Sequence, residues 1–375
     1  MKILHVCESI IGGTGSYLAE LIPHQVREYG AENIVLLIPE SQMSFLDPSV
    51  VAARPSIITF HRPRRLWGTL FLLRQYVKAL MSIKPDVVHA HSSIAGLIVR
   101  TLRCSRRAKI AFCPHGWSVD MKSAHRIRAI AEITERLLAR LPDEIIVISQ
   151  YEYKRALELG VRPERLRYIA NGISKDVPSV QAAEWKDNRS KVLFAGRFDY
   201  QKGLDVLLKA VDGLEDRISV RLVGEVAVDG NLKVEEFPPS ITKLGWLDRD
   251  GVAAQMKSSD IIVIPSRWEG FGLVAVEAMR LSKPVVASAV GGLKEILGNG
   301  GFGYLVPPED DRALHDFLAN LDAEDLRNMG ERGNTRFLAE YTSDRMVRAI
   351  DAVYTEMVGS KYRAATVQSA EEFSR

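Results

Sequence analysis

Short apolar runs rich in β-branched residues recur along the chain, and helical stretches separate most of them. Runs of this kind predict strands that are buried on both faces. Strands that alternate with helices form a parallel sheet with helices on both sides. The predicted strands are residues 2–7, 33–38, 57–60, 86–90, 109–113, 144–148, 166–169, 192–195, 219–223, 241–244, 260–265 and 285–287. The chain is therefore expected to be an α/β protein, and such sheets bind ligands at the carboxyl ends of their strands.

The length of 375 residues predicts two or three domains, at roughly 150 residues each. A polar stretch with Pro178 and no clear periodicity interrupts the strand–helix pattern near residues 171–191. Such a change in character is typical of an interdomain linker. We predict a first doubly wound domain at 1–172, a linker at 173–190, a second at 191–341 and a flexible tail at 359–375.

The cysteines and the apolar runs bear on the compartment. Cys7, Cys104 and Cys113 have neither a metal-like nor a disulfide-like spacing, which fits a reducing environment. The apolar run at the start is too short for a signal peptide. No uncharged apolar run reaches the roughly 18 residues that a spanning helix needs. We therefore expect a cytoplasmic protein with no transmembrane helix.

The segment EGFGLVAVE, residues 269–277, directly follows the predicted strand 260–265 and opens a predicted helix. A helix start has free backbone N–H groups and a partial positive charge, so Gly272 and Leu273 suit an anion such as a phosphate. Glu269 and Glu277 bracket this anion site, which suits a ligand that also carries hydroxyl groups, such as a sugar and a ribose. The other interpretation is a buried strand–helix unit with two solvated acids.

A second helix start follows strand 192–195, where Gly196-Arg197-Phe198 forms a loop and Lys202-Gly203 precedes a helix at 204–211. The planar guanidinium of Arg197 and the mobile ammonium of Lys202 can together neutralise a diphosphate. Fixed cations also stabilise negative charge that develops when a diphosphate leaves. Two surface bases beside a turn would be ordinary alone, but the 269–277 segment in the same chain favours the functional interpretation.

The first half has weaker signals. Gly12, Gly13 and Gly15 form a predicted loop before a helix opening at Ser16, but the spacing is neither a Walker loop nor a clean GxGxxG. His115 follows strand 109–113 and precedes a glycine, so it either faces a ligand or is structural. His89 and His91 alternate on one strand without the neighbours that would complete a metal set, so no metal is predicted.

The charge is distributed unevenly. Residues 1–170 contain 24 Lys and Arg against 15 Asp and Glu, whereas residues 171–375 contain 26 against 32. Residues 61–85 combine basic residues with Trp67 and Phe71, which predicts either contact with an anionic membrane surface or an amphipathic helix packed on the sheet. No nucleic-acid partner is expected, because no aromatic platform or recognition helix accompanies the basic residues.

Several of these motifs occur together in one known family. They are GG at 12–13, HG at 115–116, NG at 171–172, GR…KG at 196–203, VG at 223–224, EGFGLVAVE at 269–277 and GG at 291–292. With them, most of residues 1–350 resembles the retaining nucleotide-sugar glycosyltransferases of family 4. The HAHSS and PHGW segments are similar to members that build bacterial polysaccharides. The two acids with GR…KG upstream are specific, whereas the dipeptides are not.

The resemblance implies the GT-B architecture, in which two Rossmann-like domains face each other across a cleft and a final helix, here 342–358, returns to the first domain. It implies that Arg197 and Lys202 hold the donor diphosphate, helped by the N–H groups of Gly272 and Leu273. Glu277 would bind the ribose hydroxyls. The other donor contacts that it implies are Gly196, Gly224, Leu247, Glu269 and Phe271.

For the first domain, the resemblance implies that His115 lies near the transferred sugar and that Gly13 abuts the phosphate or the acceptor. The implied reaction moves a hexosyl unit from a UDP- or GDP-linked sugar to a saccharide or an undecaprenyl-diphosphate-linked acceptor. It requires no cofactor and no metal, and it would take place at the inner face of the cytoplasmic membrane. The alternatives are a nucleotide-sugar 2-epimerase and a non-catalytic partner in polysaccharide assembly. An oxidoreductase is disfavoured, because GxGxxG is missing after the first strand.

Overall fold

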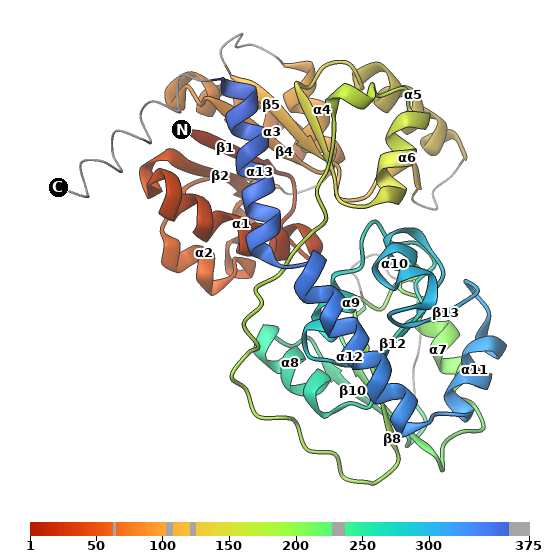
Figure 1. Ribbon diagram of the computed structural model, residues 1–375. Coiled ribbons are helices and arrows are strands. Elements are labelled where there is room, and N and C mark those ends of the chain that lie inside the picture. Colours follow the sequence, from red (N-terminus) through yellow and green to blue (C-terminus); the bar gives the residue numbers. More distant parts are fainter. Residues whose placement is uncertain (63–64, 103–107, 121–124, 227–236, 360–375) are drawn as a thin grey trace. The chain divides into compact units, whose positions relative to one another are not determined.

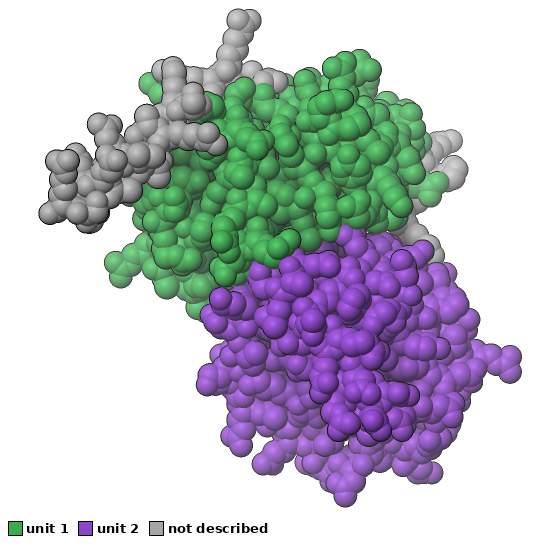
Figure 2. Space-filling view, viewed as in Figure 1, with its two compact units in different colours: residues 1–172, 343–375 green, residues 173–342 purple. Residues whose placement is uncertain are grey.

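The computed structural model describes residues 1–359 apart from 63–64, 103–107, 121–124 and 227–236 (Figure 1). The chain forms two compact α/β units, which confirms the predicted fold class (Figure 2). Unit 1 contains Met1–Gly172 and the final helix α13 (Ser343–Val358), and unit 2 contains Ile173–Thr342. The predicted tail lies outside the described residues, except for Gly359. None of the described helices is both long and apolar enough to cross a bilayer.

Unit 1 is built on a seven-stranded parallel sheet with the strand order β3-β2-β1-β4-β5-β6-β7. The strands are β1 (Ile3–Cys7), β2 (Ile34–Pro39), β3 (Ser56–Phe60), β4 (Val87–His91), β5 (Lys109–Cys113), β6 (Glu144–Val147) and β7 (Leu166–Tyr168). β1, β2 and β4 are buried along their whole length, as expected for central strands covered on both faces. The order reverses between β1 and β4, and this switch point is where parallel sheets bind ligands.

The helices of unit 1 cover both faces of this sheet. They are α1 (Gly13–Tyr29), α2 (Pro48–Ala53), α3 (Arg65–Ile83), α4 (Ser93–Thr101), α5 (His125–Leu138), α6 (Gln150–Glu158) and α13. α1 contacts both α2 and α13, whereas α4 contacts both α3 and α5 (Figure 1). Right-handed crossovers place these two groups on opposite faces, because the strand order runs in opposite directions from β1.

Unit 2 is built on a six-stranded parallel sheet with the order β10-β9-β8-β11-β12-β13. Its strands are β8 (Ser190–Ala195), β9 (Ile218–Val223), β10 (Ile241–Gly245), β11 (Ile261–Ile264), β12 (Val285–Ser288) and β13 (Tyr304–Val306). Its helices are α7 (Leu204–Ala210), α8 (Arg249–Ser258), α9 (Leu273–Arg280), α10 (Gly291–Ile296), α11 (Asp311–Ala319) and α12 (Ala323–Glu340). The switch point lies between β8 and β11, whose following loops carry the two predicted motifs.

The structure differs from the sequence-based expectation in three places. The edge strand β13 was not predicted, because three residues are too short for a clear pattern. Helix α1 begins at Gly13 rather than Ser16, and a Cβ on Gly15 would lie 2.2 Å from the Ile10 carbonyl oxygen, so this glycine permits close packing. The predicted linker belongs to unit 2, where Trp185 Nε1 donates to Ser258 Oγ at 2.9 Å.

Candidate functional site

The loops that follow β8, β9 and β10 lie side by side at the carboxyl edge of the unit 2 sheet. The backbone N–H of Gly224 donates to the Gly245 carbonyl at 2.8 Å, and the N–H of Phe198 donates to the Glu225 carbonyl at 2.8 Å. Gly224 has a φ of 133°, and a Cβ there would lie 1.9 Å from the Gly196 oxygen. The lack of a side chain at Gly224 therefore lets the ends of β8 and β9 come together.

Lys202 and Glu269 meet at this edge. The Lys202 ammonium pairs with Glu269 Oε1, which also accepts a hydrogen bond from Ser266 Oγ at 2.9 Å. The Lys202 stem passes Gly196, since a Cβ there would lie 3.6 Å from Lys202 Cδ. Gly203 (φ 66°) brings the start of α7 against the end of β11, because a Cβ on it would lie 2.0 Å from the Pro265 oxygen. The sequence predicted both charged residues at this edge but not their direct ion pair.

Arg197 is held by the loop that also carries Lys202. Its Nη2 donates to Gln201 Oε1 at 3.0 Å, and its Nε lies 2.9 Å from Asp199 Oδ2. Gln201 Nε2 in turn donates to the Trp268 carbonyl at 3.1 Å, which connects Arg197 to the residue before Glu269. The Arg197 side chain is 42% exposed, so its guanidinium remains accessible to a ligand from solvent. Asp199 and Gln201 are positioning residues that sequence reasoning did not single out.

Glycines fix the loop that carries Glu269. Gly291 has a φ of 45°, and a Cβ on it would lie 1.8 Å from the Glu269 oxygen. The N–H of Gly292 donates to the same oxygen at 3.2 Å. Gly272, with a φ of 115°, is the N-cap of α9, and no side chain caps this helix start. The N–H groups at the start of α9 therefore suit an anion, as the sequence predicted.

The ring of Phe271 is directed into unit 2. It is 4% exposed and packs edge-to-face on Tyr341, with ring centroids 5.8 Å apart. That Phe271 faces a donor sugar stays a prediction, and within unit 2 its ring contacts Tyr341. Burial of this apolar ring in the core stabilises the fold more than its exposure at a polar site would.

The remaining residues predicted in this unit lie on the flanking elements. Glu277 is half-buried on α9 and has an interaction partner. Leu247 is half-buried just before Asp248, whose carboxylate caps the start of α8 by accepting from the Gly251 N–H at 2.8 Å. Arg267 bonds both Asp205 and Glu309, which anchors the loop just before Glu269.

In unit 1, Gly13 is the first residue of α1 and His115 follows β5 with a φ of 51°. His115 Nε2 lies 2.9 Å from His91 Nδ1, and His91 Nε2 lies 3.0 Å from His5 Nδ1. Burial lowers the pKa of His5 to about 4 and that of His115 to about 3. These imidazoles are therefore neutral at physiological pH.

His5, His89 and His91 could also hold a metal ion, because one ring nitrogen of each lies within 4.8 Å of the others. The prediction that the two strand histidines have no partner for a metal set overlooked His5. This residue is distant in sequence, but β1 pairs directly with β4 and places His5 opposite His89.

A buried carboxyl group supports the loop that carries His115. Glu152 Oε2 accepts from the Ile148 N–H at 3.1 Å, and Trp117 Nε1 donates to the Glu152 carbonyl at 3.1 Å. The Gly116 N–H also bonds this carboxyl group. Burial raises the pKa of Glu152 to about 8, so the group is largely protonated at neutral pH. No sequence pattern indicated this role, because a lone glutamate in a helix is ordinary.

The chain is similar to known proteins over most of its length. Residues 11–177 match the family described as Glycosyltransferase Family 4, and residues 179–336 match Glycosyl transferases group 1. An uncharacterized 41.2 kDa protein in the cps region of Klebsiella pneumoniae is 30% identical over 331 residues, covering 85% of this chain and 89% of that protein. The Escherichia coli UDP-Gal:alpha-D-GlcNAc-diphosphoundecaprenol alpha-1,3-galactosyltransferase is 24% identical, covering 91% of this chain and 92% of that protein.

Solved structures share the fold. Anabaena HepE in complex with UDP and glucose superposes with a TM-score of 0.79 at 19% identity, covering 94% of this chain and 99% of HepE. The sucrose-phosphate synthase of Thermosynechococcus elongatus superposes with a TM-score of 0.77 at 19% identity, covering 94% of this chain and 98% of that chain.

Proposed function

Because the chain belongs to the family 4 and group 1 glycosyltransferases of GT-B fold, we propose that it transfers a hexosyl unit from a nucleoside-diphosphate sugar to a hydroxyl group of a saccharide. The transfer retains the anomeric configuration, needs no metal and serves cell-surface polysaccharide biosynthesis. The observation that carries this proposal is the convergence of Lys202, Glu269 and the Arg197 loop beside the start of α9.

The ion pair explains how one site binds both a diphosphate and a sugar. In the unliganded protein, Glu269 neutralises the Lys202 ammonium. A bound diphosphate offers that ammonium stronger acceptors, which it shares with the N–H groups of Gly272 and Leu273. Glu269 is then available to accept hydrogen bonds from sugar hydroxyl groups, and Glu277 is assigned to the ribose.

The proposed chemical step uses the two cations of this site. The bond between the anomeric carbon and the phosphate oxygen breaks, and the acceptor hydroxyl oxygen bonds to that carbon on the same face. The acceptor's proton passes to the departing phosphate oxygen. Arg197 and Lys202 stabilise the negative charge that develops on the diphosphate, in place of a metal ion. Neither Glu269 nor Glu277 forms a covalent intermediate.

The relatives support the choice of substrates. The Escherichia coli relative is named for a UDP-sugar donor and a diphosphoundecaprenol acceptor, and HepE is seen with UDP and glucose. A UDP- or GDP-linked donor and an undecaprenyl-diphosphate-linked saccharide acceptor are therefore the proposed pair. In unit 1, His115 and Gly13 are the proposed substrate contacts.

Donor binding can be tested with a thermal-shift panel of UDP- and GDP-sugars. A ligand at 100 times its Kd stabilises the protein by about 2.7 kcal/mol, so the correct donor should raise the melting temperature most.

Incubation with that donor and a lipid-linked saccharide should give a glycosylated lipid. A new sugar nucleotide formed without acceptor would indicate a 2-epimerase instead. Donor binding without transfer to any acceptor would indicate a non-catalytic partner.

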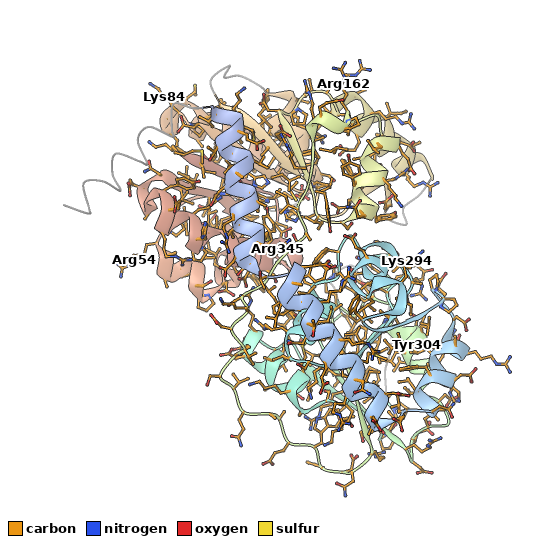
Figure 3. All side chains as sticks on the ribbon, viewed as in Figure 1. Arg54, Lys84, Arg162, Lys294, Tyr304 and Arg345 are labelled. Carbon is orange, nitrogen blue, oxygen red and sulfur yellow. The ribbon has the colours of Figure 1, made fainter. Side chains whose placement is uncertain are left out.

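An anionic membrane surface is the proposed location of the acceptor. One face of α3 packs on the core through Leu72, Tyr76 and Ala79. Its opposite face exposes apolar and basic side chains: Trp67, Leu70, Phe71, Arg74, Lys78 and Met81. α5 exposes a second apolar stripe: Ile130, Ile133 and Leu137. Basic residues elsewhere on unit 1, such as those labelled at Arg54, Lys84 and Arg162, also extend outward (Figure 3).

Liposome flotation tests the membrane proposal. The wild-type protein should float with vesicles that contain phosphatidylglycerol and stay behind with neutral vesicles. Trp67→Ser combined with Leu137→Ser should reduce flotation, whereas Leu157→Ser, at an exposed position on α6, should not. A wild-type protein that remains in the soluble fraction with anionic vesicles would contradict surface docking.

A further inference from the structure

The centre of unit 1 contains a polar cluster in a place where hydrophobic residues are expected. His5 on β1 and His89 and His91 on β4 have no solvent exposure, and Gln25 from α1 is equally buried. Tyr354 from α13 closes the cluster. Buried polar groups are costly unless they are hydrogen-bonded. The way in which these groups satisfy one another therefore limits the protonation states that they can adopt.

Three successive contacts lead from Gln25 to His115. His5 Nε2 lies 2.8 Å from Gln25 Oε1, His5 Nδ1 lies 3.0 Å from His91 Nε2, and His91 Nδ1 lies 2.9 Å from His115 Nε2. His5 and His91 each use both ring nitrogens in these contacts, whereas His115 uses only Nε2. His115 is also the least buried of the three imidazoles and lies at the carboxyl end of β5.

The direction of these hydrogen bonds follows from the chemistry of the first acceptor. An amide oxygen only accepts, and a neutral imidazole has one donor and one acceptor nitrogen. His5 must therefore donate from Nε2 to Gln25 and accept at Nδ1. His91 must then donate from Nε2 and accept at Nδ1. The same rule makes His115 donate from Nε2, which leaves its Nδ1 as an acceptor.

We propose that Gln25, His5 and His91 are positioning residues that hold His115 as the neutral Nε2–H tautomer, so that its Nδ1 accepts a hydrogen bond from a substrate hydroxyl group. The assignment of a hydroxyl-bearing substrate rests on the proposed glycosyl transfer. The tautomer itself depends only on the contacts within unit 1.

This chain of hydrogen bonds forms only while His5 and His91 are neutral. An imidazolium has two donor nitrogens and no acceptor, so protonation of His5 or His91 would set two donors against each other. The contacts of His91 with His5 and with His115 therefore hold His115 in one tautomer.

The orientation of the Gln25 amide determines the direction of every hydrogen bond from Gln25 to His115. With Nε2 of Gln25 turned toward His5, each hydrogen bond would reverse and His115 would become the Nδ1–H tautomer. The Gln25 side chain also lies beside the Tyr354 hydroxyl, although its Nε2 has no fully formed hydrogen bond. The Tyr354 hydroxyl lies 2.5 Å from His89 Nδ1, so it can donate to that nitrogen while its own oxygen faces the Gln25 amide.

A metal ion on His5, His89 and His91 is the competing explanation. It would satisfy His89 Nε2, which is buried and has no hydrogen-bond partner. Such an ion would require lone pairs on both His5 Nδ1 and His91 Nε2, which lie at hydrogen-bonding distance of 3.0 Å from each other. His91 would then donate from Nδ1 to His115 and impose the opposite tautomer. The two explanations therefore predict different protons on His115.

Long-range ¹H–¹⁵N correlation spectra of the full chain with ¹⁵N-labelled histidine distinguish them. We expect neutral Nε2–H patterns for His5, His91 and His115, with the last identified by its loss in His115→Gln. An Nδ1–H pattern for His115 would overturn the proposal, and so would an exchanging mixture. Stoichiometric zinc in the purified protein, with ligated shifts on His5 and His91, would also overturn it.

A substitution at Gln25 tests the cause. Gln25→Met removes the acceptor and should give a mixture of His115 tautomers, with kcat/KM for transfer reduced about fivefold, the scale of one net hydrogen bond. An unchanged His115 pattern in a folded Gln25→Met protein would contradict the proposal.

The spectra do not depend on turnover. A protein that shows the expected tautomers but transfers no sugar would contradict the proposed function alone. Sugar transfer by a protein whose His115 is Nδ1–H would contradict this inference alone.

Discussion

Both units place polar groups at the switch point of a parallel sheet, but one group is ionic and the other is neutral. In unit 2 the central contact is ionic, and the side chains of Lys202 and Glu269 are 20% and 9% exposed. In unit 1 the central contact joins neutral imidazoles, and both His5 and His91 are fully buried. Charges that must exchange partners with a charged ligand are kept near solvent, whereas groups that only orient a neighbour can be buried without charge.

The largest effect should come from removing a cation from unit 2. Arg197→Ala removes a stabiliser of the leaving diphosphate, so turnover should fall about 100- to 1000-fold. The matched control is Lys209→Ala, because Lys209 is an exposed cation on the neighbouring helix α7. Steady-state transfer assays measure both variants. Near-normal turnover in Arg197→Ala would show that Arg197 does not stabilise the leaving diphosphate. It would then contradict the proposed catalytic role of the cations in unit 2.

The next effect concerns the rigidity of the Glu269 loop. Gly291→Ala would place a Cβ 1.8 Å from the Glu269 oxygen at a φ of 45°. We expect a loss of about 3 kcal/mol in the free energy of unfolding, from strain and displaced backbone. Gly213→Ala is the control, because its φ is 79° but no atom lies within 4 Å of the added Cβ; it should lose about 1 kcal/mol. Equal losses in denaturant titrations would show that the contact does not matter.

Acid should lower the stability of unit 1, because its buried histidines are neutral in the folded protein. The folded pKa values of His5 and His115, about 4 and about 3, lie below the usual 6.5. The unfolded chain therefore binds more protons as the pH falls below 6.5, and stability is lost from there toward pH 4. Each such histidine contributes a slope of up to about 1.4 kcal/mol per pH unit. His5→Gln should make this acid limb shallower in urea titrations, and an unchanged slope would contradict the assignment.

An effect with the opposite sign comes from Glu152. Its folded pKa of about 8 lies above the usual 4.5, so the folded protein holds the extra proton between these values. Stability should therefore decrease as the pH rises from 4.5 to 8, by up to about 1.4 kcal/mol per unit. Glu152→Gln keeps the acceptor for Ile148 and should flatten this limb. A slope equal to that of the wild type would show that Glu152 is ionised in the fold.

The residues that the sequence singled out in unit 2 lie at one sheet edge, because each group of them is local in sequence. Arg197 and Lys202 lie in one loop and Glu269 to Leu273 in another, and strand–loop–helix patterns place both loops at one sheet edge. What the sequence could not show was the ion pair of Lys202 with Glu269, since that depends on how β8 and β11 pair.

The unit 1 cluster could not be predicted, because its members are far apart in the sequence. Its members come from β1, α1, β4, the loop after β5 and α13, and no periodicity connects them. A histidine within an apolar strand gives no indication of which residue lies opposite it. Likewise, Phe271 belongs to a functional motif, but its ring packs on Tyr341, and only the tertiary structure reveals this.

The most direct test of the central claim separates binding from chemistry in Lys202→Ala. If this ammonium stabilises charge that develops on the leaving diphosphate, kcat should fall about 100-fold or more while the donor Kd rises much less. Rapid-quench single turnovers give the chemical rate, and calorimetric titration gives the Kd. A large rise in Kd with an unchanged single-turnover rate would show that Lys202 only binds the donor, and would contradict the account.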